Sequence, residues 1–423
     1  MARQDDSVLV ARLKQSLPAE LIDEQAREVG ALVRQRRVDV VALVWTLVFG
    51  WGAGASASLA ALQRSYERHT RTKLSASSFH QRLKNPALLA LLRTLWAHAS
   101  KTQPRRALGA FEQVLALDSS FLRLWRGLLD DWPSSNPGQA GARLQMVVNV
   151  SDFTPNAVIL HDAIQNERQS WKTLGPWLRG ALLLIDLGYY DYSFFVRVAN
   201  HAGFFLSRAR RDCALTVVEV SDPRERHLIG LKLKDALAQT RREQLELRVC
   251  GSYRRPDKKP RRFEFRALAH RHPDGDMRAW LTNAPTCRVA LEDAPTLYAL
   301  RWQVELMFKG MKSLGRLSAI PTSDETIMRV LILASLLFIL CCGWLREHCF
   351  GAQKLWTSSA LRTMCVVREM SELVLEHLIA PRRTDTSLSL DQLLLAQLAR
   401  PSPCRPNAFS IPCVVEPLSL QVA

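Results

Sequence analysis

The chain has 423 residues, which is enough for two to four domains and a large buried core. Its 57 Lys and Arg residues against 40 Asp and Glu give a formal net charge of +17, which favours a polyanionic partner, nucleic acid before an anionic membrane surface. The nine cysteines include no C-x-x-C pair and no Cys/His metal spacing. This pattern argues against a zinc site or a disulfide framework and indicates reduced thiols in a cytoplasm, and the N-terminus lacks the pattern of a signal peptide.

Residues 1–105 are predicted to be all-helical. Leu59–His69 predicts a helix, and after a polar turn Ser77–Lys84 predicts a second short helix that carries Arg82 and Lys84. Basic side chains on a short helix after a turn suit contact with DNA phosphates or a DNA groove. A surface helix of a small bundle is an equally good interpretation, so this pair of helices is a candidate for DNA binding only.

From residue 106 the pattern changes to alternating strands and helices. Strand-like runs are predicted at Gln113–Leu117, Leu144–Val150, Asn156–His161 and Gly180–Ile185. A helical interval through Trp177 is predicted before the last of them, which makes an α/β domain with a mixed sheet. Asp118 and Asp186 each come directly after an apolar run, where ligand-binding side chains of α/β sheets commonly lie. Each aspartate could equally be a turn or cap residue.

Residues 213–290 predict a β-rich segment. Its strand-like runs are Leu215–Val220, Leu245–Arg254, Phe263–His270 and Met277–Thr282. Between the second and the third lies the nine-residue stretch Arg254–Arg262, with six positive charges and one negative charge. Its cations are Arg254, Arg255, Lys258, Lys259, Arg261 and Arg262. Such a hairpin tip either binds phosphates or only keeps the protein in solution.

The stretch Leu297–Leu314 predicts one amphipathic helix. Its polar face carries Tyr298, Arg301, Glu305, Lys309 and Lys312. Its apolar face carries Leu297, Leu300, Val304, Met307, Met311 and Leu314. A carboxylate among cations and a phenol either binds a metal ion and a phosphate or forms ordinary ion pairs on a solvated face.

The run Val330–Leu345 has sixteen residues without a charge, short of the roughly twenty that a spanning helix needs. It therefore predicts a buried helix and no membrane association, and the shorter apolar run Val38–Trp51 is interpreted in the same way. Helices are predicted at Trp356–Ala380 and Leu388–Leu398, followed from Pro401 by a poorly ordered tail.

With these residues in hand, the chain resembles the bacterial insertion-sequence transposases of the DDE type that carry a Y-x2-R-x3-E-x6-K signature. Tyr298, Arg301, Glu305 and Lys312 match the four signature positions with the spacing intact. The resemblance covers roughly residues 110–345.

The two family aspartates correspond to Asp118 and Asp186, and Gly188 and Tyr189 complete the D-x-G-Y context around the second. The resemblance implies a ribonuclease-H-like mixed-sheet catalytic core of α/β class with a β-strand insertion, flanked by an all-helical N-terminal domain and a helical C-terminal region. The implied division is a DNA-binding domain at 1–105, the first part of the core at 106–212, the insertion at 213–290, the second part of the core at 291–347 and the helical C-terminal region at 348–423.

By the same resemblance, three residues are both catalytic and metal-binding: Asp118, Asp186 and Glu305. They would hold two Mg²⁺ ions, with Mn²⁺ able to substitute. The residues implied to hold DNA phosphates are Tyr298, Arg301 and Lys312. Lys309 lies on the same face outside the signature, and Trp302 and Trp280 are candidates for stacking a flipped base, with a core tryptophan as the alternative for each.

The function implied is that of a DNA transposase that binds the terminal inverted repeats of its own element, hydrolyses the phosphodiester and transfers the strand. Its partner would be double-stranded DNA, bound by a homodimer in the end-paired complex, in a cytoplasmic and nucleoid-associated protein. Two alternatives stay open from the residues alone, namely a DNA-binding relative or regulator without catalysis and a metal-dependent nuclease of similar fold.

Overall fold

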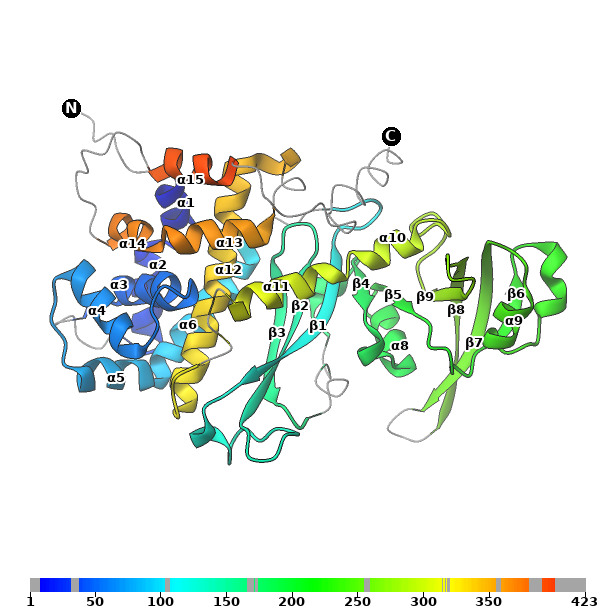
Figure 1. Cartoon of the computed structure of the whole chain (residues 1–423), viewed down its shortest axis with the longest axis horizontal. Helices are drawn as coiled ribbons and strands as arrows, with labels where there is room; N and C mark the ends of the chain where they lie inside the picture. The colour runs from blue at the N-terminus through cyan, green and yellow to red at the C-terminus, as the bar shows by residue number, and fades with distance from the viewer. Residues whose placement is uncertain are drawn as a thin grey trace.

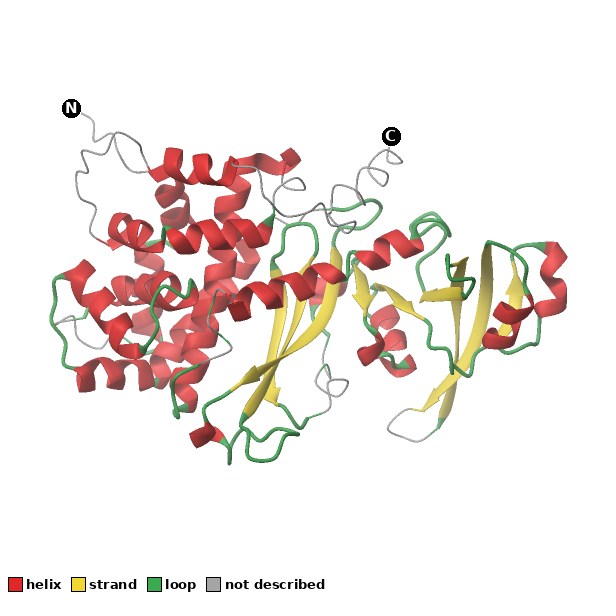
Figure 2. Cartoon of the chain, viewed as in Figure 1, coloured by secondary structure: helices red, strands yellow, loops and turns green. Residues whose placement is uncertain are grey.

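The computed structural model describes residues 8–31, 38–102, 107–165, 171, 174–254, 259–313, 315, 317, 320–354, 359–379 and 390–399. Most of the helices gather at one end of the protein and the strands at the other (Figure 1, Figure 2). The described residues form helices together with one sheet of parallel and antiparallel pairs, which confirms the predicted α/β class with a mixed sheet.

Nine strands form one sheet in the order β3-β2-β1-β4-β5-β9-β8-β7-β6. Their bounds are β1 Val114–Arg123, β2 Gly141–Asn149, β3 Pro155–Asp162, β4 Leu182–Ile185, β5 Phe204–Arg208, β6 Thr216–Val220, β7 Gln244–Arg254, β8 Pro260–Arg271 and β9 Met277–Thr282. The strands β3, β2 and β1 pair in antiparallel fashion, β4 runs parallel to β1, and β5 runs parallel to β4. The strands of residues 213–290 continue the same sheet, because β9 pairs with β5 and each further pair is antiparallel.

The centre of the sheet is apolar on both faces. All four residues of β4 are buried, as expected for a short parallel strand covered on both sides. Along β1, alternate residues enter different cores: Ala116 and Leu122 face the core shared with the helices, whereas Leu115 and Leu117 face the core on the other side of the sheet. This alternation places the side chain of Asp118 on the face toward the helices.

The helical end is built around α12 Glu325–Lys354. The N-terminal helices are α1 Val8–Ser16, α2 Ala19–Glu28, α3 Val40–Trp45, the π-helix η1 Thr46–Gly52, α4 Leu59–Thr70, α5 Ala76–Lys84 and α6 Pro86–Thr102. The C-terminal helices are α13 Ala360–Glu369, α14 Ser371–Ile379 and α15 Leu390–Ala399. Helices from both groups pack on α12, so the N-terminal and C-terminal segments share one hydrophobic core.

Within the described residues, α12 is the one helix long and apolar enough to cross a membrane, over Glu325–Phe350. However, 78% of its apolar window is buried inside the protein. The predicted buried helix at Val330–Leu345 is therefore confirmed as the central helix of the core.

The helical interval predicted through Trp177 falls largely on positions 166–170 and 172–173, outside the described residues, and its described end forms the 3-10 turn η3 Pro176–Leu178. The helix α8 Tyr192–Asn200 follows β4. One predicted element is wrong in detail. The single helix predicted for Leu297–Leu314 consists of α10 Ala294–Ala299 and α11 Trp302–Ser313. The chain turns more tightly between them, where the N–H groups of Arg301 and Val304 donate to carbonyls three residues earlier.

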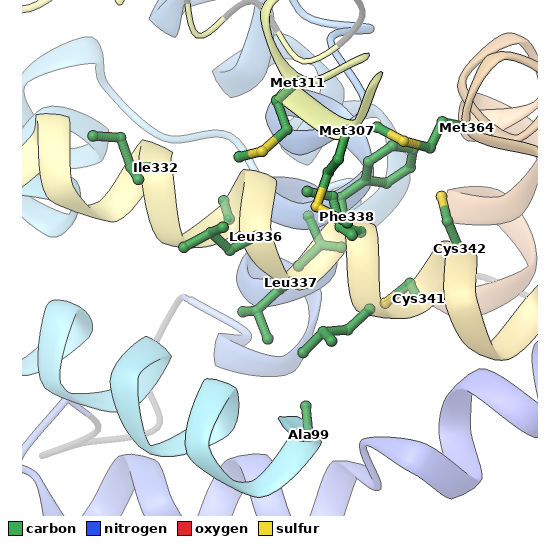
Figure 3. Packing of buried hydrophobic residues seen from close by; sticks show 14 of the residues in the cluster. Ala99, Met307, Met311, Ile332, Leu336, Leu337, Phe338, Cys341, Cys342 and Met364 are labelled. Carbon is green, nitrogen blue, oxygen red and sulfur yellow. The ribbon is translucent and has the colours of Figure 1, made fainter. Parts of the chain in front are cut away.

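Met307 and Met311 point from α11 toward α12, near Phe338 (Figure 3). Together with Leu297, Leu300 and Val304 they form a buried stripe, as predicted from the sequence. The helix α11 also packs on β1 and α13, so it lies between the sheet and the helical end.

The close contact between η1 and α12 depends on Gly52. A Cβ atom on Gly52 would lie 2.6 Å from the carbonyl oxygen of Ala334 and 2.9 Å from the Cβ of Phe338. We expect Gly52→Ala to lower the free energy of unfolding by about 1–3 kcal/mol because backbone atoms would have to move apart. Urea denaturation measures this loss. Ser78→Ala on the exposed face of α5 is the control, with a change within about 0.5 kcal/mol, and equal stability of the two variants would contradict the prediction.

Candidate active site

The strands β1 and β4 bring the two aspartates together. Leu117 pairs with Ile185 in the parallel ladder, so the next residue of each chain, Asp118 and Asp186, lies at the same level of adjacent strands. Asp118 remains within β1, whereas Asp186 begins the 3-10 turn η4 Leu187–Tyr189 and accepts a hydrogen bond from Gly188 N–H. The sequence showed two aspartates 68 positions apart, and only the strand pairing makes them neighbours.

Glu305 stands in the first turn of α11, which packs on β1. Arg301 lies in the tight turn just before this helix, and its guanidinium faces all three carboxylates. Its Nη2 donates to Glu305 Oε1 at 2.8 Å, its Nη1 lies 3.8 Å from Asp118 Oδ2, and its Nε lies 3.7 Å from Asp186 Oδ1. One cation therefore sits at the point where the three predicted catalytic residues meet.

The electrostatics of the cluster follow from its burial. Desolvation raises the pKa of Asp118 to about 6; the Ser119 N–H and Arg301 work against this rise, and the charges of Asp186 and Glu305 add to it. Burial acts to lower the pKa of Arg301, but Asp186, Tyr298 and Glu305 outweigh it and the net direction is upward. Three carboxylates in one partly buried place thus demand a positive charge, which Arg301 supplies in this structure.

The donor set of Asp118, Asp186 and Glu305 fits a hard divalent cation in kind, because it offers carboxylate oxygens only. Within the described residues, no group of three or more His, Cys, Asp or Glu side chains is already arranged around a common ion position. The three carboxylates surround the guanidinium instead.

The other signature residues line the same wall at different depths. Burial raises the pKa of Tyr298 to about 12, and its ring lies 5.9 Å from the guanidinium carbon of Arg301. Lys312 is half-buried, which lowers its pKa, whereas Lys309 is exposed. Tyr298 is therefore a packed neighbour of Arg301, and the two lysines continue the polar face of α11 beyond Glu305.

The two tryptophan candidates differ in exposure. Trp302 is 45% exposed and follows Arg301 directly. Trp280 is only 8% exposed, and its ring meets those of His270 and Tyr298 edge-on. Trp280 is therefore a core residue in this structure, and Trp302 is the more exposed of the two tryptophans.

The remaining DNA-binding candidates lie away from the carboxylates. At the β7–β8 hairpin the exposed cations are Arg254, Lys259, Arg261 and Arg262, while Arg255 and Lys258 fall outside the described residues. On the predicted pair of helices, now α4 and α5, Arg82 is half-buried and Lys84 forms an ion pair with Asp324 at 3.1 Å. Lys84 thus joins α5 to the start of α12, in addition to any contact with DNA.

Two cations near the site were not singled out from the sequence. Arg208 ends β5 at the level of Asp186, because Ser207 pairs with Ile185. Arg143 of β2 donates to Ser119 Oγ at 3.4 Å, next to Asp118. Neither residue belongs to a motif, so only the strand register could have indicated them.

Comparison with known proteins places the chain in a family. Residues 109–340, more than half of the chain, match the family described as "Transposase DDE domain". The protein therefore belongs to this family of transposases, and the matched range contains Asp118, Asp186 and Glu305.

Individual relatives are distant. The chain is 25% identical over 214 residues to "Putative transposase y4zB" of Sinorhizobium fredii (strain NBRC 101917 / NGR234), an alignment that covers 50% of this chain and 55% of that protein. The chain thus spans about half the length of this curated relative. A cryo-EM structure of the piggyBac transposase synaptic complex with hairpin DNA matches with a TM-score of 0.46 and 10% identity over 94% of this chain and 87% of that one. This TM-score is too low to establish a shared fold.

The raised pKa of Asp118 predicts a pH dependence of stability. A carboxyl group whose pKa is raised by folding, here from 3.8 to about 6, stabilises the folded state fully below the unfolded value, and this contribution is lost as pH rises through the folded value. Between about pH 4 and pH 6, without divalent cations, we expect the free energy of unfolding to lose up to about 3 kcal/mol from this group. Urea denaturation of Asp118→Asn should lack this part of the decline. An unchanged decline in the variant would contradict the assignment.

Proposed function

We propose that the protein is a Mg²⁺-dependent DNA transposase that cuts and joins DNA at the terminal inverted repeats of its own insertion sequence. One observation carries the proposal: in a chain of the DDE transposase family, the two aspartates and Glu305 meet around one cation from β1, the end of β4 and α11. A catalytic core of ribonuclease-H-like type and membership of the Y-x2-R-x3-E-x6-K group belong to the same proposal. The strands β1, β2 and β3 are antiparallel neighbours, and β4 and β5 run parallel to β1. This arrangement supports the ribonuclease-H-like core.

Asp118, Asp186 and Glu305 would hold the divalent cations, for which Mn²⁺ can substitute. Such ions activate a water for attack on a phosphodiester and stabilise the leaving oxygen. The protein's own task is to fix the three carboxylates, which the β1–β4 ladder and the packing of α11 on β1 achieve. A rigid arrangement of this kind suits both the hydrolysis and the later attack by a 3′ hydroxyl, because both reactions occur at phosphorus.

The cations of α11 would hold the DNA strand next to these carboxylates. Arg301 can bind a phosphate in bidentate fashion, and Lys312 adds a point charge two turns beyond Glu305. Tyr298 packs beside Arg301 and orients it. Trp302, exposed next to Arg301, offers a ring for stacking a displaced base. Lys309 would contact a further phosphate from the same polar face of α11.

The partner is double-stranded DNA, and two copies of the protein would pair the two ends of the element in the cytoplasm, at the nucleoid. Besides the α11 cations, the candidate contacts are the α4–α5 pair and the exposed described cations of the β7–β8 hairpin, Arg254, Lys259, Arg261 and Arg262. The net charge of +17 supports a phosphate-rich partner.

Asp118→Asn, Asp186→Asn and Glu305→Gln test the proposed chemistry. Each change removes one anionic oxygen ligand, so we expect Mg²⁺-dependent cleavage of end DNA to fall by roughly 1000-fold or more, about 4 kcal/mol in the barrier, while DNA binding is retained. Gel assays of nicking and of strand transfer measure the two reactions, and a gel mobility-shift assay measures DNA binding. Glu292→Gln, an exposed acid just before α10, is the matched control with unchanged cleavage.

Cleavage that persists in the three variants would refute the proposal. Binding of end DNA without any cleavage by the wild-type protein would favour a DNA-binding relative. Cleavage without strand transfer would favour a nuclease of similar fold.

The hairpin tip gives a separate prediction. Arg261 and Arg262 are exposed on β8, so replacing both with Gln should weaken DNA binding on all sequences and reduce the slope of log affinity against log salt by about one for each lost phosphate contact. Fluorescence anisotropy over a salt series measures the slope. Arg12→Gln on α1, which Figure 1 shows at the opposite end of the molecule, is the control. A double variant with an unchanged slope would exclude the hairpin from the DNA interface.

A further inference from the structure

The phosphate-binding role proposed for Arg301 conflicts with its contacts in this structure. As a phosphate-binding residue it must extend toward DNA, yet in this structure its guanidinium faces Asp118, Asp186 and Glu305 at once. The same three carboxylates are the residues that would hold divalent cations. A side chain that neutralises the carboxylates and a cation that binds to them therefore compete for the same oxygens.

The contacts of the Arg301 guanidinium with the carboxylates are weak enough for the side chain to move away from them. Only the bond to Glu305, at 2.8 Å, is a hydrogen bond, while the approaches to Asp118 and Asp186, at 3.8 and 3.7 Å, are held by charge rather than by hydrogen-bond geometry. The guanidinium has five donors, so most of its hydrogen-bonding capacity is not used by these carboxylates. A phosphate offers the bidentate geometry that they lack here.

The backbone gives Arg301 a distinct position. It lies in the tight turn between α10 and α11 rather than inside a helix, whereas Glu305 is fixed one turn later in α11. Movement of the guanidinium away from the carboxylates therefore needs a change of side-chain rotamer and no change in α11, which is held by its buried face.

We propose that Arg301 is a charge gate that couples cation binding to DNA binding at this site. The guanidinium stays with the three carboxylates and opposes divalent cations until a DNA phosphate draws it away, and the carboxylates then bind the cations. The inference rests on the proposed function and adds its regulation: metal ions are held firmly only when DNA is in place. Since coupling between two ligands is reciprocal, cations must strengthen DNA binding by the same factor.

Electrostatics make the competition strong. The guanidinium lies within 4 Å of an oxygen of each carboxylate, at a position where Arg301 and Asp118 are largely buried. At such distances in a partly buried site, repulsion between a guanidinium and a divalent cation is only weakly screened by water or salt.

The test measures Mn²⁺ binding by electron paramagnetic resonance, which does not depend on cleavage. It compares the wild-type protein, Arg301→Gln and Arg301→Lys, with and without a DNA duplex carrying the terminal repeat of the encoding element. We expect Arg301→Gln to bind Mn²⁺ about tenfold or more tightly than wild type without DNA, because the competing charge is gone. The duplex should tighten Mn²⁺ binding by a similar factor in wild type and hardly at all in Arg301→Gln. Arg301→Lys keeps the charge and should bind Mn²⁺ as weakly as wild type without DNA.

The matched control is Arg126→Gln, an exposed arginine of the turn η2 Arg126–Leu128, which should leave the Mn²⁺ affinity unchanged. Thermal unfolding of each variant confirms that it is folded at the assay temperature. If Arg301→Gln does not fold, the change in Mn²⁺ affinity that the duplex causes in the wild-type protein tests the proposal by itself.

The proposed gate is overturned if Arg301→Gln binds Mn²⁺ no more tightly than the wild-type protein without DNA. It is also overturned if the duplex leaves the Mn²⁺ affinity of the wild-type protein unchanged. The proposed function survives that result if Mg²⁺-dependent cleavage still requires Asp118. It fails separately if no variant binds Mn²⁺ with or without the duplex and no cleavage is seen.

Discussion

The parallel pairing of β1 with β4 is the constraint on which the candidate site depends. Residues 114–117 of β1 and all of β4 are buried, so a slip of one residue would exchange side chains between the two cores on either side of the sheet. The register that pairs Leu117 with Ile185 is therefore strongly determined, and it holds Asp118 and Asp186 level with each other. The positions of Asp118 and Asp186 therefore depend on the packing of the sheet.

The helix α11 completes the site because it is held from two sides. Met307 and Met311 pack toward α12, while the same helix rests on β1 and presents Glu305 to the aspartates. The helical end therefore does more than carry a candidate DNA-binding pair of helices: through α12 it supports the wall of the site. This explains why segments from both ends of the chain share one core with the residues of the transposase domain.

Charge balance connects the site with its ligands. Burial raises the pKa of Asp118, and the charges of Asp186 and Glu305 add to this rise, so the three carboxylates require a cation nearby. Arg301 meets this need from the turn between α10 and α11, and the gate that we propose follows from the fact that phosphate and divalent cation would act on the same group of side chains. The resting arrangement and the working arrangement would then differ mainly in the place of one guanidinium.

The sequence by itself determined most strands, the buried stripe of α11 and the buried course of α12, because alternation and helical period are local properties. The three acidic residues that the structure brings together were indicated only through the spacing of a family motif. It did not place Asp118 and Asp186 side by side except through the family resemblance, it did not show that Leu297–Leu314 turns at Arg301, and it left open whether Trp280 is buried. Nor did it indicate Arg208 and Arg143. Only the tertiary structure decided these points, because strand order, register and helix packing depend on contacts between residues far apart in the chain.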